Sequence, residues 1–353
     1  NKKGVYMKIV LADYSSMYLL ILLLILSFIR KSKILHSCTE DEYLSKDITD
    51  SLKGLSVIIV VFHHISLFSV KQGIFKYLFV NSGFLAVSVF LFVSGYGLMT
   101  QFKLKKNYLK NFILNKVLRL YLIFFISNII VTILNNIFLQ TNYNVKSILM
   151  SSVLMNFSNG RELWFVGIIL FFYIAFYISF KFFNNKSILM LLGLSIIYII
   201  LCRFINNGTW WYNTAICFII GVLISLNKSK VFNFIKNRYA SNLILSVIFL
   251  ASSMLLYTKG YSNLQFIIPI IFIYFICTLL VKVQLKSKSM KYINKISFEM
   301  YLIHLIVLQI AFKDDITRNS IYLVALFPIM IVLSIITKWI CDTLFKGIKR
   351  ILG

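Results

Sequence analysis

The chain has 353 residues, of which 59% are hydrophobic and only 14% are charged, and its mean hydropathy is +0.86. A soluble domain needs far more polar surface, so this composition excludes a soluble globular protein and indicates an integral membrane protein. The net charge of +26 would suit a nucleic-acid-binding protein, but the basic residues lie in clusters between apolar runs. We therefore interpret them as the basic loops of a membrane protein.

Eleven apolar stretches recur along the chain. A spanning helix needs about 20 apolar residues, so the shorter stretches must recruit flanking residues or cross a thin region. The pattern predicts an all-α fold, a polytopic membrane helical bundle of about eleven transmembrane helices. The stretches lie near 14–29, 54–70, 78–99, 120–139, 162–180, 187–205, 212–226, 241–257, 263–281, 296–312 and 320–340.

The first stretch resembles a signal peptide, but no small-residue cleavage site follows it. Arg30, Lys31 and Lys33 come next and are typical of a stop-transfer flank, so we expect a retained helix. We assign 1–47 to this additional helix and an acidic cytoplasmic linker, and 48–353 to one membrane domain.

The lysines and arginines predict the orientation. With the first residues outside, the segments 30–53, 101–119, 181–186, 227–239 and 282–295 and the tail from 338 lie inside. These segments hold 26 of the chain's 37 basic residues, as expected for cytoplasmic loops.

Lys53 and His64 are the most informative pair. Eleven residues complete about three turns of an α-helix, so the two side chains share a face, roughly 16 Å apart along the axis. Ionisable groups inside membrane spans are costly and are interpreted as functional by default. A neutral imidazole is a suitable general base for a hydroxyl, so His64 is the candidate base, with His63 turned toward a neighbouring helix.

Two further regions carry candidate residues with alternative interpretations. Lys116 and Arg119 are three residues apart at the start of a span, where they could clamp phosphates or simply reflect the positive-inside rule. Trp164, within 161–165, could belong to a site or anchor the helix at the membrane edge. Ser94 lies among small residues that let helices pack closely.

The segment from Ser297 to His304 holds the last candidates. Ser297, Tyr301 and His304 share one helical face, whereas Glu299 points elsewhere and must find a partner on another helix or in the interface. His304 could be functional or could only hydrogen-bond a neighbouring helix. The five cysteines show no metal-ligand spacing, so we expect no metal site.

These patches together resemble acyltransferase family three, the integral-membrane enzymes that O-acylate bacterial surface glycans. Lys53 followed by ten residues and His64 is similar to the family's Arg/Lys-x10-His signature. Further matches lie at 90–95 (Phe-Phe-x-x-Ser-Gly), 116–119 (Arg-x-x-Arg), 163–165 (Leu-Trp-Phe) and 297–304 (Ser-Tyr-x-x-Tyr-Leu-x-His). The chain departs from the family pattern with Lys53 and Lys116 for arginine, Phe298 for tyrosine, and the additional first helix.

The resemblance implies an O-acetyltransferase of the bacterial plasma membrane. It would move acetyl from cytoplasmic acetyl-CoA, with no permanently bound cofactor, to a capsule, exopolysaccharide or other envelope glycan or lipid-linked saccharide. His64 would be the base, Glu299 would orient it or the sugar, and Lys53, Lys116 and Arg119 would hold the CoA phosphates. The residues expected to support the site or the substrate are Asp50, His63, Ser94, Trp164, Tyr301 and His304.

Two other classes of protein fit the span count. A transporter or flippase for lipid-linked saccharides also needs buried polar groups, but it has no need of a base above a phosphate-binding cation. A polysaccharide polymerase usually presents a large outer loop, which this sequence lacks.

Overall fold

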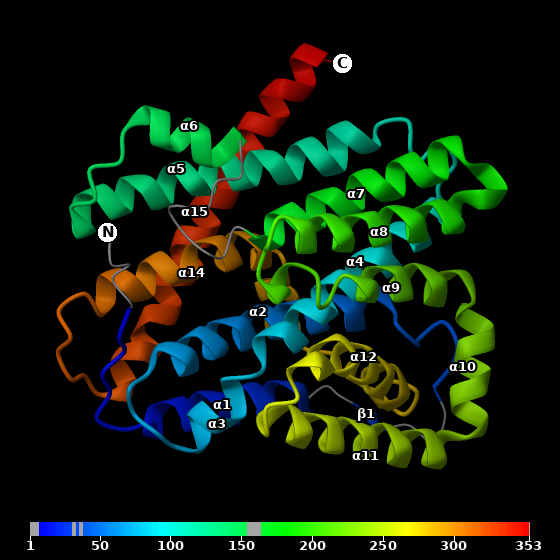
Figure 1. The fold of residues 1–353 in the computed structure, drawn as a ribbon, viewed down its shortest axis with the longest axis horizontal. Coiled ribbons are helices and arrows are strands. Elements are labelled where there is room, and N and C mark those ends of the chain that lie inside the picture. Colours follow the sequence, from blue (N-terminus) through cyan, green and yellow to red (C-terminus); the bar gives the residue numbers. More distant parts are fainter. Residues whose placement is uncertain (1–6, 30–32, 35–37, 154–163, 353) are drawn as a thin grey trace.

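The structure is a computed structural model that describes residues 7–29, 33–34, 38–153 and 164–352. Its elements are almost entirely helical (Figure 1). The longer helices are α1 (Ser15–Ile29), α2 (Lys46–Phe68), α4 (Gly83–Leu104), α5 (Arg119–Leu139), α7 (Trp164–Phe182), α8 (Ser187–Phe204), α9 (Ile216–Leu226), α11 (Tyr239–Thr258), α12 (Ile268–Leu279), α14 (Ser297–Ala311) and α15 (Ser320–Leu352).

Shorter elements lie in the connections. The short α-helices are α3 (Ile74–Phe79), α6 (Val145–Val153), α10 (Lys228–Asn237) and α13 (Lys288–Asn294). A π-helical turn, η1 (Ile113–Leu118), leads into α5, and 3₁₀ turns are η4 (Asn184–Lys186), η5 (Thr209–Trp211) and η6 (Ser262–Phe266). The antiparallel strands β1 (Lys33–Ile34) and β2 (Val283–Gln284) pair with each other.

Each of the eleven apolar stretches overlaps one of the longer helices, which confirms the all-α polytopic bundle. Eight continuous helical stretches in the described residues are long and apolar enough to cross a membrane, and a ninth forms if the bent pair α13 and α14 counts as one span. The remaining two, α1 and α12, are apolar but shorter. Fewer helices therefore have full spanning length than the sequence predicts, because α12 is only 12 residues long and α1 only 15.

The exposed and buried faces of the outer helices are those of a membrane protein. In α11 the buried residues are Asn242, Ser246 and Ser253, whereas large apolar side chains such as Ile248 and Phe249 are exposed. Apolar side chains are as stable against lipid as in the protein interior, whereas polar groups in the bilayer need partners within the protein. The chain is therefore a multi-pass membrane protein.

The centre of the bundle consists of α2, α4, α9 and α14. Helix α2 packs against α4, α13 and α14, so residues 240 positions apart in sequence become neighbours. Close approach of α4 and α9 depends on two glycines: a Cβ added to Gly95 would lie 2.1 Å from the Phe218 carbonyl oxygen, and one added to Gly221 would lie 2.1 Å from the Phe92 carbonyl oxygen. Backbone contact of this kind tolerates no larger residue without moving a helix.

The two ends of the bundle differ. Helix α10 and the β1–β2 pair lie toward one end, and the loop that joins α14 to α15 lies at the other (Figure 1). Helix α2 runs between these ends, so its first and last turns face different compartments in the predicted orientation.

Gly95→Ala should lower the stability of the protein by about 1–3 kcal/mol, because the added methyl group overlaps the backbone of α9. Gly97→Ala, in the same helix, meets nothing within 4 Å and should change stability by no more than about 1 kcal/mol, in the stabilising direction. Thermal unfolding of the two variants in detergent measures the difference. Equal unfolding midpoints would contradict the role given to Gly95.

Candidate active site

Lys53 and His64 lie on one uninterrupted helix, α2, as the sequence predicts. The helix covers Lys46–Phe68 in 23 residues, and most of its apolar face is buried. Eleven residues correspond to roughly 16 Å of rise, so the lysine lies near the first turns and the histidine near the last. A single rigid element therefore sets the separation of the two groups.

His64 is paired with His304 of α14. Nδ1 of His64 lies 3.0 Å from Nε2 of His304 and 3.0 Å from the carbonyl oxygen of Val60. Nδ1 of His304 lies 2.7 Å from the carbonyl oxygen of Tyr301. A carbonyl oxygen only accepts hydrogen bonds, so Nδ1 of a neutral His304 carries the hydrogen and its Nε2 is an acceptor.

The same reasoning defines the tautomer of His64. Both neighbours of its Nδ1 are acceptors, so Nδ1 donates and Nε2 carries the lone pair. His304 is completely buried, whereas His64 is half-buried. The pair therefore presents one basic nitrogen, Nε2 of His64, while the second imidazole holds the ring in place.

Aromatic rings define the rest of the His64 environment. The Phe68 ring, one turn later on α2, stacks on His64 with centroids 6.1 Å apart. His63 faces a neighbouring helix as expected: its Nδ1 lies 3.2 Å from the Phe79 carbonyl oxygen, and its ring packs against Gly83. His63 therefore lies beside the pair, and its ring packs against the start of α4.

Tyr301 and Trp164 are one layer further out. The buried Tyr301 ring lies 5.0 Å from Phe165 and 5.9 Å from His304, measured between centroids. Trp164 begins α7 and packs edge-on against Phe165. The preceding residues 161–163, part of the same sequence patch, lie outside the described residues.

Glu299 does not contact His64; the group that orients the imidazole is His304. The helix turns Glu299 away from the histidine face, where its carboxylate meets Lys338 of α15 at 3.8 Å. Lys338 also lies 3.7 Å from Asp342, which accepts from Arg119 at 2.7 Å. The expectation that Glu299 meets another helix is confirmed. Of its two expected roles, orienting the imidazole is not what its position favours, and orienting the sugar stays a prediction.

A basic cavity opens at the other end of α2. Its volume is about 1070 Å³, and Nζ of Lys53 donates to Oγ of Ser94 at 3.3 Å on its wall. Asp50 also lines it and is held by Lys46 and by Asn294. The lysines on its walls are Lys46, Lys53, Lys105, Lys106, Lys110, Lys116 and Lys228.

The acidic linker borders this cavity. Burial lowers the pKa of Lys228, and the nearby carboxylates of Glu40 and Asp41 act in the opposite direction. Glu40 also accepts a hydrogen bond from Ser229, at the start of α10. The linker acids therefore hold α10 at the cavity mouth while the cavity walls stay predominantly cationic.

Lys116 and Arg119 are separated by the local helix geometry. Both lie at the start of a span, but Lys116 is within the π-helical turn η1, which has more residues per turn than an α-helix. Residues three apart therefore no longer share a face: Lys116 lines the cavity, while Arg119 binds Asp342 and lies over the Phe345 ring. Of the two residues, only Lys116 lines the cavity.

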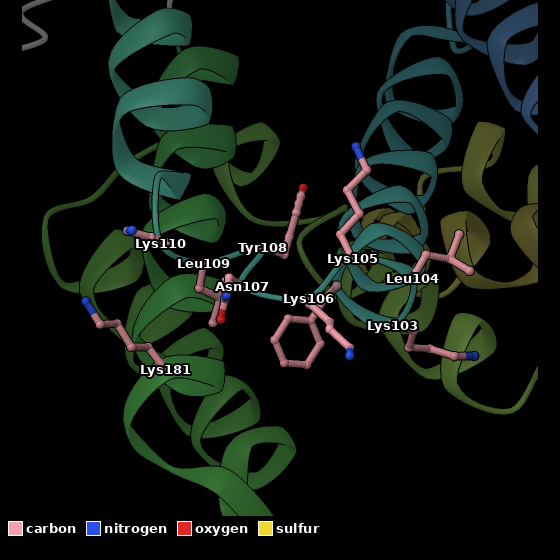
Figure 2. A pocket seen from close by; sticks show the side chains of 10 residues that line it. Lys103, Leu104, Lys105, Lys106, Asn107, Tyr108, Leu109, Lys110 and Lys181 are labelled. Carbon is pink, nitrogen blue, oxygen red and sulfur yellow. The ribbon is translucent and has the colours of Figure 1, made fainter. Parts of the chain in front are cut away.

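A second, smaller cavity of about 750 Å³ is lined by the same loop, from Lys105 to Lys110. Figure 2 shows Lys105 and Lys106 pointing in opposite directions from this loop, with Lys181 reaching the cavity from α7. Lys103 donates to the Ser225 carbonyl oxygen at 2.7 Å and so anchors the end of α4. The basic residues of the loop therefore contribute to both cavities.

Several residues of the site have no sequence signal. Lys338 and Asp342 lie in an amphipathic stretch that is typical of the cytoplasmic end of a membrane helix. Lys228 belongs to a short polar helix outside the apolar stretches. Only the spacing of Glu299 points to such a residue. It turns Glu299 away from the histidine face and so predicts a cationic partner on another helix, which is Lys338.

The fold and site define a multi-pass membrane protein with a histidine pair inside the bundle and a cationic cavity at one end. The family described as acyltransferase domain matches residues 48–339. The chain therefore belongs to acyltransferase family three and is a membrane acyltransferase. Neither the curated proteins nor the solved structures that were searched contain a match to it.

Lys338→Ala should destabilise the protein by about 1–3 kcal/mol, because Glu299 is only 2% exposed and would lose its cation. Lys338→Arg keeps the charge and should retain most of the stability. Lys346→Ala, an exposed position on the same helix, serves as the matched control. Unfolding midpoints that fall equally for Lys338→Ala and Lys346→Ala would refute this assignment.

Proposed function

We propose that the protein is an O-acetyltransferase that moves acetyl from cytoplasmic acetyl-CoA to a hydroxyl of an envelope glycan. The observation that carries the proposal is the placement of Lys53 and His64 toward opposite ends of α2, with His304 of α14 paired to His64. One end offers a base and the other a cation in a basic cavity. Acyl transfer from acetyl-CoA uses a base to take the proton of the acceptor hydroxyl and cations to bind the phosphates of the donor.

The cavity suits the nucleotide end of the donor. Coenzyme A carries several phosphate charges, and ammonium groups bind phosphate as point charges. Lys53 and Lys116 line the cavity from two different helical segments, and Lys105, Lys106 and Lys110 line it from the loop after α4. The pantetheine arm then extends along α2, which places the thioester toward His64.

The histidine pair suits the transfer step. Nε2 of His64 takes the proton of the acceptor hydroxyl as the hydroxyl oxygen attacks the thioester carbonyl carbon. The C–S bond then breaks, the new ester forms, and the imidazolium returns the proton to the departing thiolate. During the step, Nδ1–H of His64 is held by the Val60 carbonyl oxygen and by Nε2 of His304.

The acceptor class comes from the resemblance. Members of this family modify surface glycans, so we propose a capsule, exopolysaccharide or lipid-linked saccharide acceptor and a bacterial plasma membrane location. With acetyl-CoA in the cytoplasm and the glycan outside, the donor would enter at the Lys53 end of α2 and the acceptor at the His64 end.

His64→Ala should reduce acetyl transfer by about 100-fold or more, because it removes the base. The measurement is the ester content of surface glycan by NMR, compared between the parent, a deletion strain and the variant, together with release of coenzyme A by the purified protein. Normal acetylation by His64→Ala at normal protein level would refute the proposed role of His64 as the base.

The neighbouring histidine is the matched control. His63→Ala loses the contact with Phe79 but leaves the His64–His304 pair in place, so it should lower activity far less than His64→Ala. Equal losses for the two variants would show that the position of α2, rather than the imidazole of His64, limits the reaction.

Lys53→Ala should raise KM for acetyl-CoA by about 10-fold, since a charge-assisted contact contributes about 1.5–3 kcal/mol. Its effect on kcat should be smaller, and Lys53→Arg should restore binding. Lys313→Ala is the control, because this exposed lysine lies after α14, at the other end of the bundle. An unchanged KM for Lys53→Ala would argue against the cavity as the donor site.

A further inference from the structure

A short strap formed by residues 9–13 crosses the His64 end of the bundle. The strap lies ahead of α1 and outside the region that matches the family. It runs in extended conformation and forms isolated parallel bridges with two distant segments, at Ser69 and at Arg318. Its side chains Ile9 and Leu11 are buried, so the strap is part of the packed structure.

The first half of the strap holds the end of α2. The amide of Ile9 donates to the Phe68 carbonyl oxygen at 3.0 Å, and the amide of Val70 donates to the Ile9 carbonyl oxygen at 3.0 Å. Phe68 is the residue whose ring stacks on His64. The strap therefore contacts Phe68, and Phe68 in turn contacts the imidazole of His64.

The second half holds the start of α15. The amide of Ala12 donates to the Arg318 carbonyl oxygen at 2.9 Å, and the amide of Arg318 donates to the Val10 carbonyl oxygen at 3.0 Å. Asp13 also accepts a hydrogen bond from Ser320 at 2.7 Å. Because α15 packs on α14, this half of the strap lies on the side of the bundle that carries His304.

Tyr14 extends the same connection. Its hydroxyl group donates to the Lys71 carbonyl oxygen at 2.6 Å and lies 2.7 Å from Oγ of Ser69, while its ring stacks on Phe75. The strap and Tyr14 thus join the ends of two helices that no continuous element connects at this end.

We propose that the strap is a positioning element that fixes the distance between His64 and His304. The proposal rests on the proposed function for its effect on acetyl transfer, but its effect on the geometry of the pair can be measured separately. The pair bridges α2 and α14, so any splaying of these helices lengthens the contact between the imidazoles. The strap links the two sides by backbone hydrogen bonds, which resist such splaying without occupying the site.

Ala12→Pro tests the proposal, because proline removes the amide that donates to Arg318. Ala12 is exposed, and the extended Leu11 before it is compatible with a following proline. Ala12→Ser keeps the amide and is the matched control. We expect kcat to fall about 10-fold in Ala12→Pro, since small misplacements of catalytic groups have large effects, while KM for acetyl-CoA stays unchanged.

The independent readout is the rate at which diethyl pyrocarbonate modifies His64 in the purified full chain, followed by mass spectrometry. The reagent attacks an unprotonated imidazole nitrogen, so its rate depends on the lone pair at Nε2 and on the contact at Nδ1. We expect a changed rate at His64 in Ala12→Pro and the parent rate in Ala12→Ser. A parent rate at His64 in folded Ala12→Pro protein overturns the proposal, whatever happens to stability.

The two proposals fail in different ways. A changed His64 modification rate in a protein without acetyl transfer would support the strap and refute the proposed function. If Ala12→Pro does not fold, Asp13→Ala replaces it, because it removes the hydrogen bond that Asp13 of the strap accepts from Ser320 at the start of α15. The same change in kcat and in His64 modification is then expected, and parent values for both overturn the strap.

Discussion

The absence of water from a bilayer requires each polar group within it to find a partner in the protein, and this constraint shapes the whole bundle. It explains why α11 buries Asn242, Ser246 and Ser253 and exposes its phenylalanine and isoleucines. It also explains why Glu299, nearly inaccessible on α14, faces a lysine from α15. The histidine pair obeys the same rule, because each Nδ1 has a carbonyl acceptor from the preceding turn.

One ring nitrogen of the pair is an exception to this rule among the described residues, and the proposed function depends on it. Three of the four ring nitrogens meet a carbonyl oxygen or the other imidazole, so Nε2 of His64 is the nitrogen at which the pair presents a lone pair. In the common histidine–carboxylate arrangement the second group is an anion that stabilises the protonated ring. His304 is a neutral acceptor, so it orients His64 with less effect on its basicity, which suits a base that must also release its proton.

Much of the fold followed from the sequence, because hydrophobic stretches and basic loops respond directly to the bilayer. Lys53 and His64 could be placed on one face since both lie within one helix, where spacing determines direction. His304 could not be paired with His64, because they are 240 residues apart and only tertiary packing brings α2 and α14 together. Arg119 was misplaced for a local reason: the π-helical turn at 113–118 alters the helical phase that the spacing assumes.

Lys53 and Lys116 occupy positions where the family pattern has arginine. The π-helical turn separates Lys116 from Arg119, so no arginine of this pair lines the cavity. An arginine fork binds phosphate with two parallel hydrogen bonds and needs a defined approach, whereas an ammonium group on a flexible stem adapts to several. With Arg119 held by Asp342, the cavity contains point charges from several directions instead of a rigid clamp. Binding of the proposed donor in such a cavity would depend on the summed charge of separate ammonium groups rather than on one fixed hydrogen-bonding geometry.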